Sequence, residues 1–101
     1  MNDIHLLIDN EDRPAKTGAT YDRIDPVTDA VATRAPAAST EDAVAAVEAA
    51  AAAFPKWSAT GPNERRKLLL KAADIMDSKA GEFMALVTAE TGATGPWGGF
   101  N

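Results

Sequence analysis

The chain has 101 residues, no cysteine, a formal net charge of -5 and a hydrophobic content of 46%, of which only a small part is aromatic. The lack of cysteine excludes disulfides, thiolate metal sites and a cysteine nucleophile within these residues. The acidic balance argues against non-specific nucleic-acid binding, and no apolar run approaches the ~20 residues of a membrane span. We therefore expect a cytoplasmic protein without nucleic-acid or membrane partners. Because much of the apolar content is alanine, we also expect a small core and faces that need covering.

The beginning of the chain predicts short strands joined by turns. Residues 4–9 are rich in branched apolar side chains and predict a strand, which the polar residues 10–12 should break. Residues 13–20 contain a proline and a glycine and predict a loop. Residues 21–24 alternate large and polar side chains, so we expect a half-buried strand, with residues 31–35 as the return strand of an antiparallel hairpin. Such a sheet is only marginally stable unless something packs on it.

A helix is predicted next. Ser39 is a candidate N-cap, and Asp42 stands three residues later, in the position that closes a capping box. The alanine-rich run that follows has high helix propensity. One stripe at helical spacing should pack closely against its surroundings; its members are Val44, Val47, Ala51 and Phe54. We expect Pro55 to end this helix. Trp57 should lie in the following linker and fill the gap between the two helices as a core anchor, a role we favour over a functional one.

Two further helices and the start of a fourth are predicted after residue 60. Pro62 and Asn63 should open the first, which has a broad apolar face opposite a charged one. A break at residues 78–81 leads to the next helix, which Gly92 should close in a left-handed conformation. Pro96 then begins a fourth element at the end of the sequence, from which we expect the chain to be truncated within a helix.

The residues alone provide no recognisable catalytic arrangement. The glycines lack the spacing of a phosphate loop, and His5 has no second imidazole or thiolate with which to hold a metal. The basic cluster that begins at Arg65 is more typical of a solvated or ion-pairing face than of a phosphate site. Neighbouring carboxylates at 11–12 and 41–42 are expected to be turn and cap residues rather than an acid–base couple. We therefore predict no catalytic, cofactor-binding or metal-binding residue here.

Trp97 is the strongest candidate for a functional side chain. It lies between Gly95-Pro96 and Gly98-Gly99 and shares a short helix with Phe100. Its small neighbours should leave the indole exposed to whatever packs there. Two interpretations stay open, a helix-packing anchor and an aromatic wall of a substrate passage.

Four spaced motifs occur in a characteristic order: Asp25-Pro26-Val27-Thr28, a helix over 39–54 followed by Trp57, a segment beginning Glu64-Arg65-Arg66, and Glu90-Thr91-Gly92. Together they resemble the N-terminal region of NAD(P)-dependent aldehyde dehydrogenases. The closing TGPWGGFN is most similar to the branch that acts on aromatic aldehydes such as salicylaldehyde, vanillin or benzaldehyde.

The resemblance implies an α/β fold of which this chain is the N-terminal piece, mostly helical with a short antiparallel hairpin near its start. Residues 1–101 would form the incomplete first part of the cofactor-binding domain, with strands and turns in 1–36 and helices in 39–101. The implied activity is oxidation of an aldehyde, aromatic in this branch, to the carboxylic acid with NAD or NADP. The catalytic cysteine and glutamate and most cofactor-binding residues would lie outside the chain, which alone should be inactive.

The resemblance also implies a substrate site and partners. Trp97, and less directly Phe100, would line the aldehyde channel. Many members bind a structural cation through backbone carbonyls at positions matching Arg23 and Ile24, but the other ligands are missing, so no metal is predicted. The partners would be a small-molecule aldehyde, the rest of the polypeptide and further copies in a homo-oligomer. The alternative is a small stand-alone helical module that binds a protein through exposed apolar faces.

Overall fold

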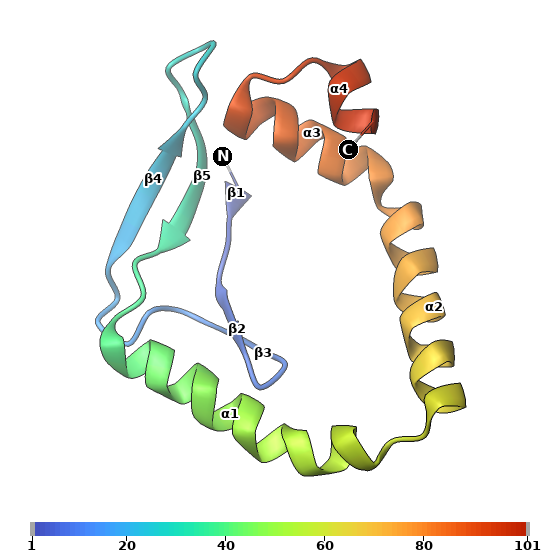
Figure 1. Ribbon diagram of the computed structural model, residues 1–101. Coiled ribbons are helices and arrows are strands. Elements are labelled where there is room, and N and C mark those ends of the chain that lie inside the picture. Colours follow the sequence, from blue (N-terminus) through green and yellow to red (C-terminus); the bar gives the residue numbers. More distant parts are fainter. Residues whose placement is uncertain (1, 101) are drawn as a thin grey trace.

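The computed structural model describes residues 2–100, so the two ends of the predicted 1–101 unit lie outside the described residues. The chain forms a flat, open frame with strands on one side and four helices along the others (Figure 1). These are α1 (Thr40–Ala59), α2 (Pro62–Ser78), α3 (Ala80–Thr91) and α4 (Gly95–Phe100). The frame measures 48 × 36 × 14 Å with a Cα radius of gyration of 16.9 Å, against roughly 13 Å for a compact domain of this length. The mostly helical content agrees with the prediction.

The described strands form two small sheets. β5 (Val31–Pro36) is the centre of a three-stranded sheet, antiparallel to β4 (Thr20–Ile24) and parallel to β1 (Asn2–Asp3). β2 (Leu6–Ile8) and β3 (Glu11–Arg13) form a separate antiparallel hairpin. The predicted pairing of β4 with β5 is confirmed, whereas the parallel partner β1 was not predicted.

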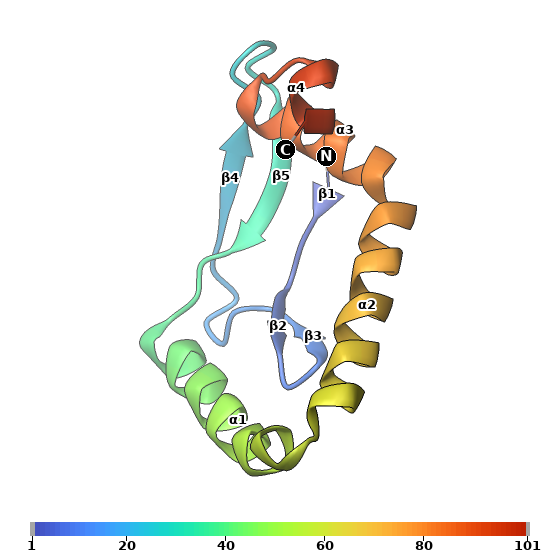
Figure 2. The ribbon, with the colours of Figure 1, turned by 45° about the vertical axis from the view of Figure 1, so that its right-hand side comes forward.

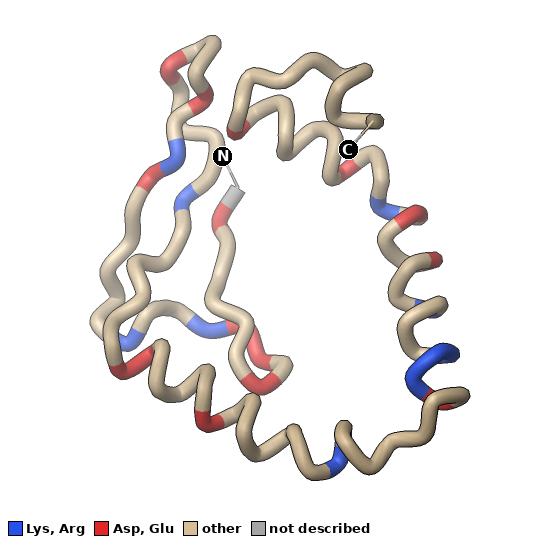
Figure 3. The backbone as a smooth tube through the Cα atoms, in the orientation of Figure 1, with Lys and Arg blue, Asp and Glu red and all other residues tan. Residues whose placement is uncertain are grey.

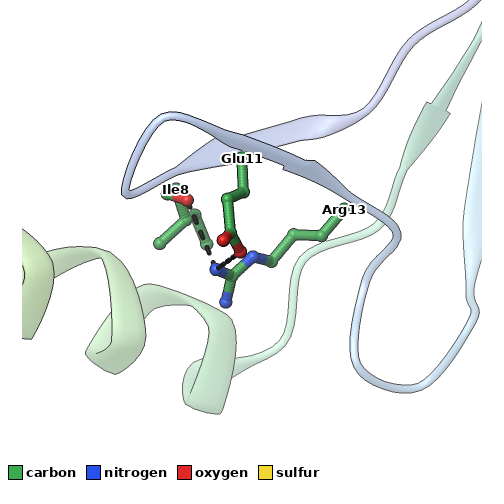
Figure 4. Close-up of polar contacts among 3 residues, drawn as sticks. All are labelled: Ile8, Glu11 and Arg13. Atoms are coloured by element: carbon green, nitrogen blue, oxygen red, sulfur yellow. Dashed lines mark hydrogen bonds and ion pairs between the residues drawn. The ribbon is translucent and has the colours of Figure 1, made fainter.

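The predicted short strand and turn are present, because β2 ends at Ile8 and residues 9–10 form a turn, but Glu11 and Asp12 belong to the return strand β3, which was not predicted. Asp9 and Asn10 have positive φ angles of 55° and 60°, as the two central residues of a type I′ turn require, and Asp and Asn tolerate this conformation well. Glu11 therefore pairs directly with Ile8. The Arg13 guanidinium donates to the Ile8 carbonyl at 3.3 Å and to the Glu11 carboxylate at 3.0 Å, which ties the hairpin together (Figure 4).

Residues 21–24 form the predicted strand, but the prediction that this strand is half-buried is wrong. Every residue of β4 is exposed, because β4 is an edge strand and helix α3 contacts mainly β5. Burial is concentrated on β5, where Thr33 is 1% exposed. The alternation in the sequence marks a strand, but burial depends on what covers it.

Helix α1 begins with the predicted capping box and ends later than predicted. The Asp42 amide donates to Ser39 Oγ at 3.3 Å, and the Ser39 amide donates to Asp42 Oδ2 at 2.8 Å. The helix continues through Pro55 to Ala59, so the prediction that Pro55 ends it is wrong. Trp57 consequently lies in the last turn of α1, not in a linker.

Arg65 of α2 stabilises the end of α1. Its Nη2 donates to the carbonyl oxygen of Trp57 at 2.7 Å and to that of Ser58 at 3.0 Å. The Trp57 carbonyl also accepts from the amide of Thr60, the C-cap residue, at 3.1 Å. The guanidinium carbon also lies 5.2 Å from the centre of the Trp57 ring, a cation–π geometry. These contacts give external support to the turn that follows Pro55, where the proline removes one internal hydrogen bond and its ring crowds the preceding turn.

The buried apolar core of the described residues is very small, and its members are Ile8, Ala15 and Ala35. The stripe on α1 that was expected to pack closely is open instead, with Val47 68% exposed. Leu69 and Met76 on the apolar face of α2 are also exposed. The expectation of faces that need covering is therefore confirmed.

Candidate functional site

Helices α3 and α4 lie side by side at one end of the frame (Figures 1 and 2). Gly92 caps the end of helix α3, and its φ of 72° is the predicted left-handed conformation. A Cβ at this position would lie 3.1 Å from Pro26 Cγ and 3.2 Å from Val27 Cγ2. Position 92 therefore favours glycine for two reasons, the left-handed backbone conformation and the close approach of the β4–β5 turn.

Two glycines of α4 lie at its contact with α3, and of the two only Gly99 is closer to α3 than an added Cβ would ordinarily allow. A Cβ on Gly98 would lie 3.6 Å from the Cα atom of Met84, and one on Gly99 would lie 3.2 Å from the Met84 sulfur. The Gly98 amide donates to the Thr94 carbonyl at 3.0 Å, which closes the turn into α4. The sequence identified these glycines only as small neighbours of Trp97. Their contact with Met84 was missed, because nothing in the local pattern shows which helix lies opposite.

Helix α4 brings the two predicted site residues together. Trp97 and Phe100 are three positions apart, so their side chains are neighbours on the helix surface. Their ring centroids are 5.9 Å apart and their planes make an angle of 27°, a stacked arrangement that aromatic pairs favour. The two side chains are 58% and 81% exposed. The structure therefore places them side by side on an open aromatic surface.

An apolar groove of about 460 Å³ adjoins this surface. It lies between the end of α2, α3 and α4, and its lining includes Phe83, Met84 and Phe100 but not Trp97. Asp77 is the one charged residue of the lining. The sequence carries no charged side chain from Thr91 to the end of α4, and this stretch is uniformly uncharged in Figure 3. Such a surface suits a neutral aromatic ring better than an ion.

Glu90 connects α3 to the sheet, and the sequence did not single it out as a functional residue. Its Oε1 accepts a hydrogen bond from Thr33 Oγ1 at 3.1 Å, and its Oε2 lies 3.3 Å from Arg23 Nη1. A carboxylate in the last turn of a helix opposes the helix dipole. That unfavourable position is a signal, readable in the sequence, that a cationic partner should come from another element.

The first turns of the three longer helices carry acidic side chains, which disfavour an anion such as the pyrophosphate of NAD(P) at those helix ends. Such a group binds well at a helix N-terminus, but the Asp42 carboxylate occupies the first turn of α1. Glu64 and Glu82 stand in the first turns of α2 and α3. Within residues 2–100, no group of three His, Asp or Glu side chains is placed to hold a metal ion. None of the helices in that range combines the length and apolar character needed to cross a membrane.

Comparison with known proteins gives one consistent result. The model of the aldehyde dehydrogenase family matches residues 13–97. The chain is 50% identical over 101 residues to a vanillin dehydrogenase from Pseudomonas fluorescens. The aligned region covers 100% of this chain and 21% of that protein.

Solved structures contain the same arrangement of elements. A salicylaldehyde dehydrogenase from Pseudomonas putida G7, complexed with salicylaldehyde, matches with a TM-score of 0.95 and 39% identity over 99% of this chain and 21% of that one. PnpE in complex with nicotinamide adenine dinucleotide matches with a TM-score of 0.90 and 38% identity over 95% of this chain and 20% of that one. The chain thus spans about a fifth of the length of the relatives that it matches.

Proposed function

The chain belongs to the aldehyde dehydrogenase family, and we propose that it serves as a section of an enzyme that oxidises an aromatic aldehyde to the carboxylic acid with NAD or NADP. The whole-chain similarity to a vanillin dehydrogenase carries this proposal, and the uncharged aromatic surface of α4 supports it. Residues 1–101 would form the N-terminal part of the cofactor-binding domain, with strands and turns in 1–36 and helices in 39–101.

Trp97 and Phe100 would form an aromatic wall of the aldehyde passage. A neutral aromatic ring gains stacking and dispersion energy on this exposed pair, and it displaces water from apolar surface. A short aliphatic aldehyde offers less area to the same wall and gains less. The nicotinamide cofactor, when bound, supplies the hydride acceptor. Its binding residues, the catalytic cysteine and the glutamate base would come from other parts of the enzyme.

The same proposal covers the partners and the location. The exposed apolar faces of α1 and α2, which include Phe54 and Leu69, would be covered by further parts of the polypeptide. We also propose that the enzyme is a homo-oligomer of the cytoplasm. With a net charge of -5, the chain offers no electrostatic attraction to nucleic acid.

A segment exchange tests the proposed function. The segment of the Pseudomonas fluorescens vanillin dehydrogenase that aligns with this chain is replaced by residues 1–101, and oxidation of vanillin and benzaldehyde is followed as NADH or NADPH absorbance. We expect kcat/KM for vanillin to lie within about tenfold of the value for the parent enzyme. A tenfold difference corresponds to ~1.4 kcal/mol of transition-state stabilisation. An exchange enzyme that is folded and has the parent's oligomeric state, but does not oxidise aromatic aldehydes, would refute the proposal.

A further inference from the structure

We infer that Glu90 is a positioning residue for the aromatic pair: through Thr33 and Arg23 it fixes the end of α3, and with it α4, against the sheet. The inference rests on the proposed function in one respect, that Trp97 lies against the aldehyde. It goes further by assigning a role in substrate binding to a carboxylate that is not itself part of the aromatic surface.

The Glu90 carboxylate contacts both residues of one cross-strand pair between β4 and β5. Arg23 and Thr33 are direct cross-strand partners, so their side chains lie on the same face of the sheet. One carboxylate oxygen accepts from the Thr33 hydroxyl at 3.1 Å, and the other lies 3.3 Å from Arg23. Because Thr33 is 1% exposed, water cannot easily replace Glu90 as its acceptor, and loss of the carboxylate would leave a buried hydroxyl unsatisfied.

A second contact holds the same end of α3. Gly92 follows Glu90 by two residues and lies against Pro26 and Val27 in the turn that joins β4 to β5. The β4–β5 hairpin therefore fixes the end of α3 at two points, one through the Glu90 side chain and one through the backbone of Gly92. Such a two-point attachment sets both the place and the direction of the helix end.

Helix α4 depends on α3 for its position. Only Ala93 and Thr94 separate the cap of α3 from Gly95, the first residue of α4. A helix of six residues is too short to be stable alone, and among the described residues it packs on α3, with Met84 at the contact. A shift at the end of α3 is thus transmitted to Trp97, and small misplacements of substrate-contacting groups are costly.

The test compares variants of the exchange enzyme that separate the two partners of Glu90. Glu90→Gln keeps the size but removes the charge that faces Arg23, and Thr33→Val removes the hydroxyl while keeping the shape. Thr33→Ser retains the hydroxyl. The matched control is Glu82→Gln, the same change at an exposed position of the same helix.

We expect Glu90→Gln and Thr33→Val to raise KM for vanillin about fivefold with little change in kcat, the pattern of lost binding without lost chemistry. KM for propanal should stay unchanged, because propanal makes little use of the aromatic wall. Thr33→Ser and Glu82→Gln should behave like the unsubstituted exchange enzyme. Equal changes in KM for both aldehydes, or a Glu90→Gln enzyme identical to Glu82→Gln, would overturn the inference.

Hydrogen–deuterium exchange in the same enzymes gives a readout that does not depend on activity. We expect Glu90→Gln, compared with Glu82→Gln, to accelerate exchange in the peptide that covers residues 93–100 while leaving the first turn of α1 unchanged. Identical exchange of that peptide in both variants would overturn the inference even if the enzyme were inactive. An unsubstituted exchange enzyme without activity would refute only the proposed function, so the two failures are distinguishable.

Discussion

The backbone amide of Lys16 donates to both carboxylate oxygens of Asp42, at 3.1 and 3.2 Å, across 26 positions of the chain. The same carboxylate accepts from the amide of Ser39 at 2.8 Å and from its hydroxyl at 2.9 Å. These hydrogen bonds lower the pKa of Asp42, and the one from the Ser39 amide contributes most. One buried carboxylate therefore joins the loop after β3 to the start of α1.

This arrangement predicts a loss of structure in acid. Because folding lowers the pKa of Asp42, the carboxylate stabilises the fold above its unfolded pKa of about 3.9, and the stabilisation is lost as the pH falls through the lower folded pKa. We expect the Lys16 amide resonance of the chain to titrate with a midpoint below that unfolded value.

The variant Asp42→Asn is the control for this titration. It should abolish the step at Lys16 but leave the step of Asp22, whose pKa is lowered by its hydrogen bond from Arg34. A Lys16 midpoint above the ordinary pKa of aspartate would contradict the assignment.

The corner between α1 and α2 provides a test of Arg65. Arg65→Lys keeps the charge but loses the planar group that lies over Trp57 and reaches two carbonyl oxygens. We expect a loss of about 1 kcal/mol in the free energy of unfolding of the exchange enzyme, measured in urea. The matched control is Arg66→Lys at the next position, where the side chain is exposed. Equal losses in both variants would show that Arg65 has no special role at the corner.

The features that the sequence predicted correctly are those whose cause is local. The capping box needs only Ser39 and Asp42 at a fixed spacing, and the left-handed cap needs only a glycine at position 92. The end of α1 was predicted wrongly, and the turn after Pro55 accepts two hydrogen bonds from Arg65 of another helix, a contact that no local pattern shows. The burial of β4 was predicted wrongly because it depends on which faces other elements cover.

The same distinction applies to the candidate site. Trp97 and Phe100 could be named from their glycine-rich setting and the family resemblance, and their mutual stacking follows from helical spacing. The contact of α4 with Met84 and the bond from Thr33 to Glu90, 57 positions apart, could not be named. These contacts depend on the path of the chain between the partners, which no local pattern encodes.

Gly81, in the first turn of α3, and Gly92, the cap that follows this helix, should respond to alanine in opposite directions. Gly92→Ala places a side chain at a φ of 72° and within 3.2 Å of Pro26 and Val27, so we expect a loss of more than about 1 kcal/mol in the free energy of unfolding. Gly81→Ala meets nothing within 4 Å in the first turn of α3, so we expect a gain of about 0.5 kcal/mol from helix propensity. Thermal unfolding of the exchange enzyme measures both. A loss at position 81 as large as that at position 92 would contradict the role of backbone conformation.

Removal of the indole tests the aromatic wall. In the exchange enzyme we expect Trp97→Ala to lower kcat/KM for vanillin about tenfold, the effect of losing ~1.4 kcal/mol of stacking and apolar contact. The loss for propanal should be smaller, and Trp97→Phe should retain most of the activity. Trp57→Phe is the matched control, because Trp57 lies in the last turn of α1, far along the frame from α4 (Figure 1). Equal losses on both aldehydes would remove Trp97 from the site.

The behaviour of the 101-residue chain alone follows from its exposed apolar faces. Phe54 on α1 and Leu69 on α2 are 66% and 63% exposed, and exposed apolar surface of this extent favours association. We expect a partly helical circular dichroism spectrum, a broad thermal transition and a sedimentation coefficient that rises with concentration. Leu69→Glu should weaken the association without reducing the helix content, because it changes an outward-facing side chain and keeps a good helix former. A sharp, concentration-independent transition of a monomer would contradict this expectation and favour the stand-alone helical module instead.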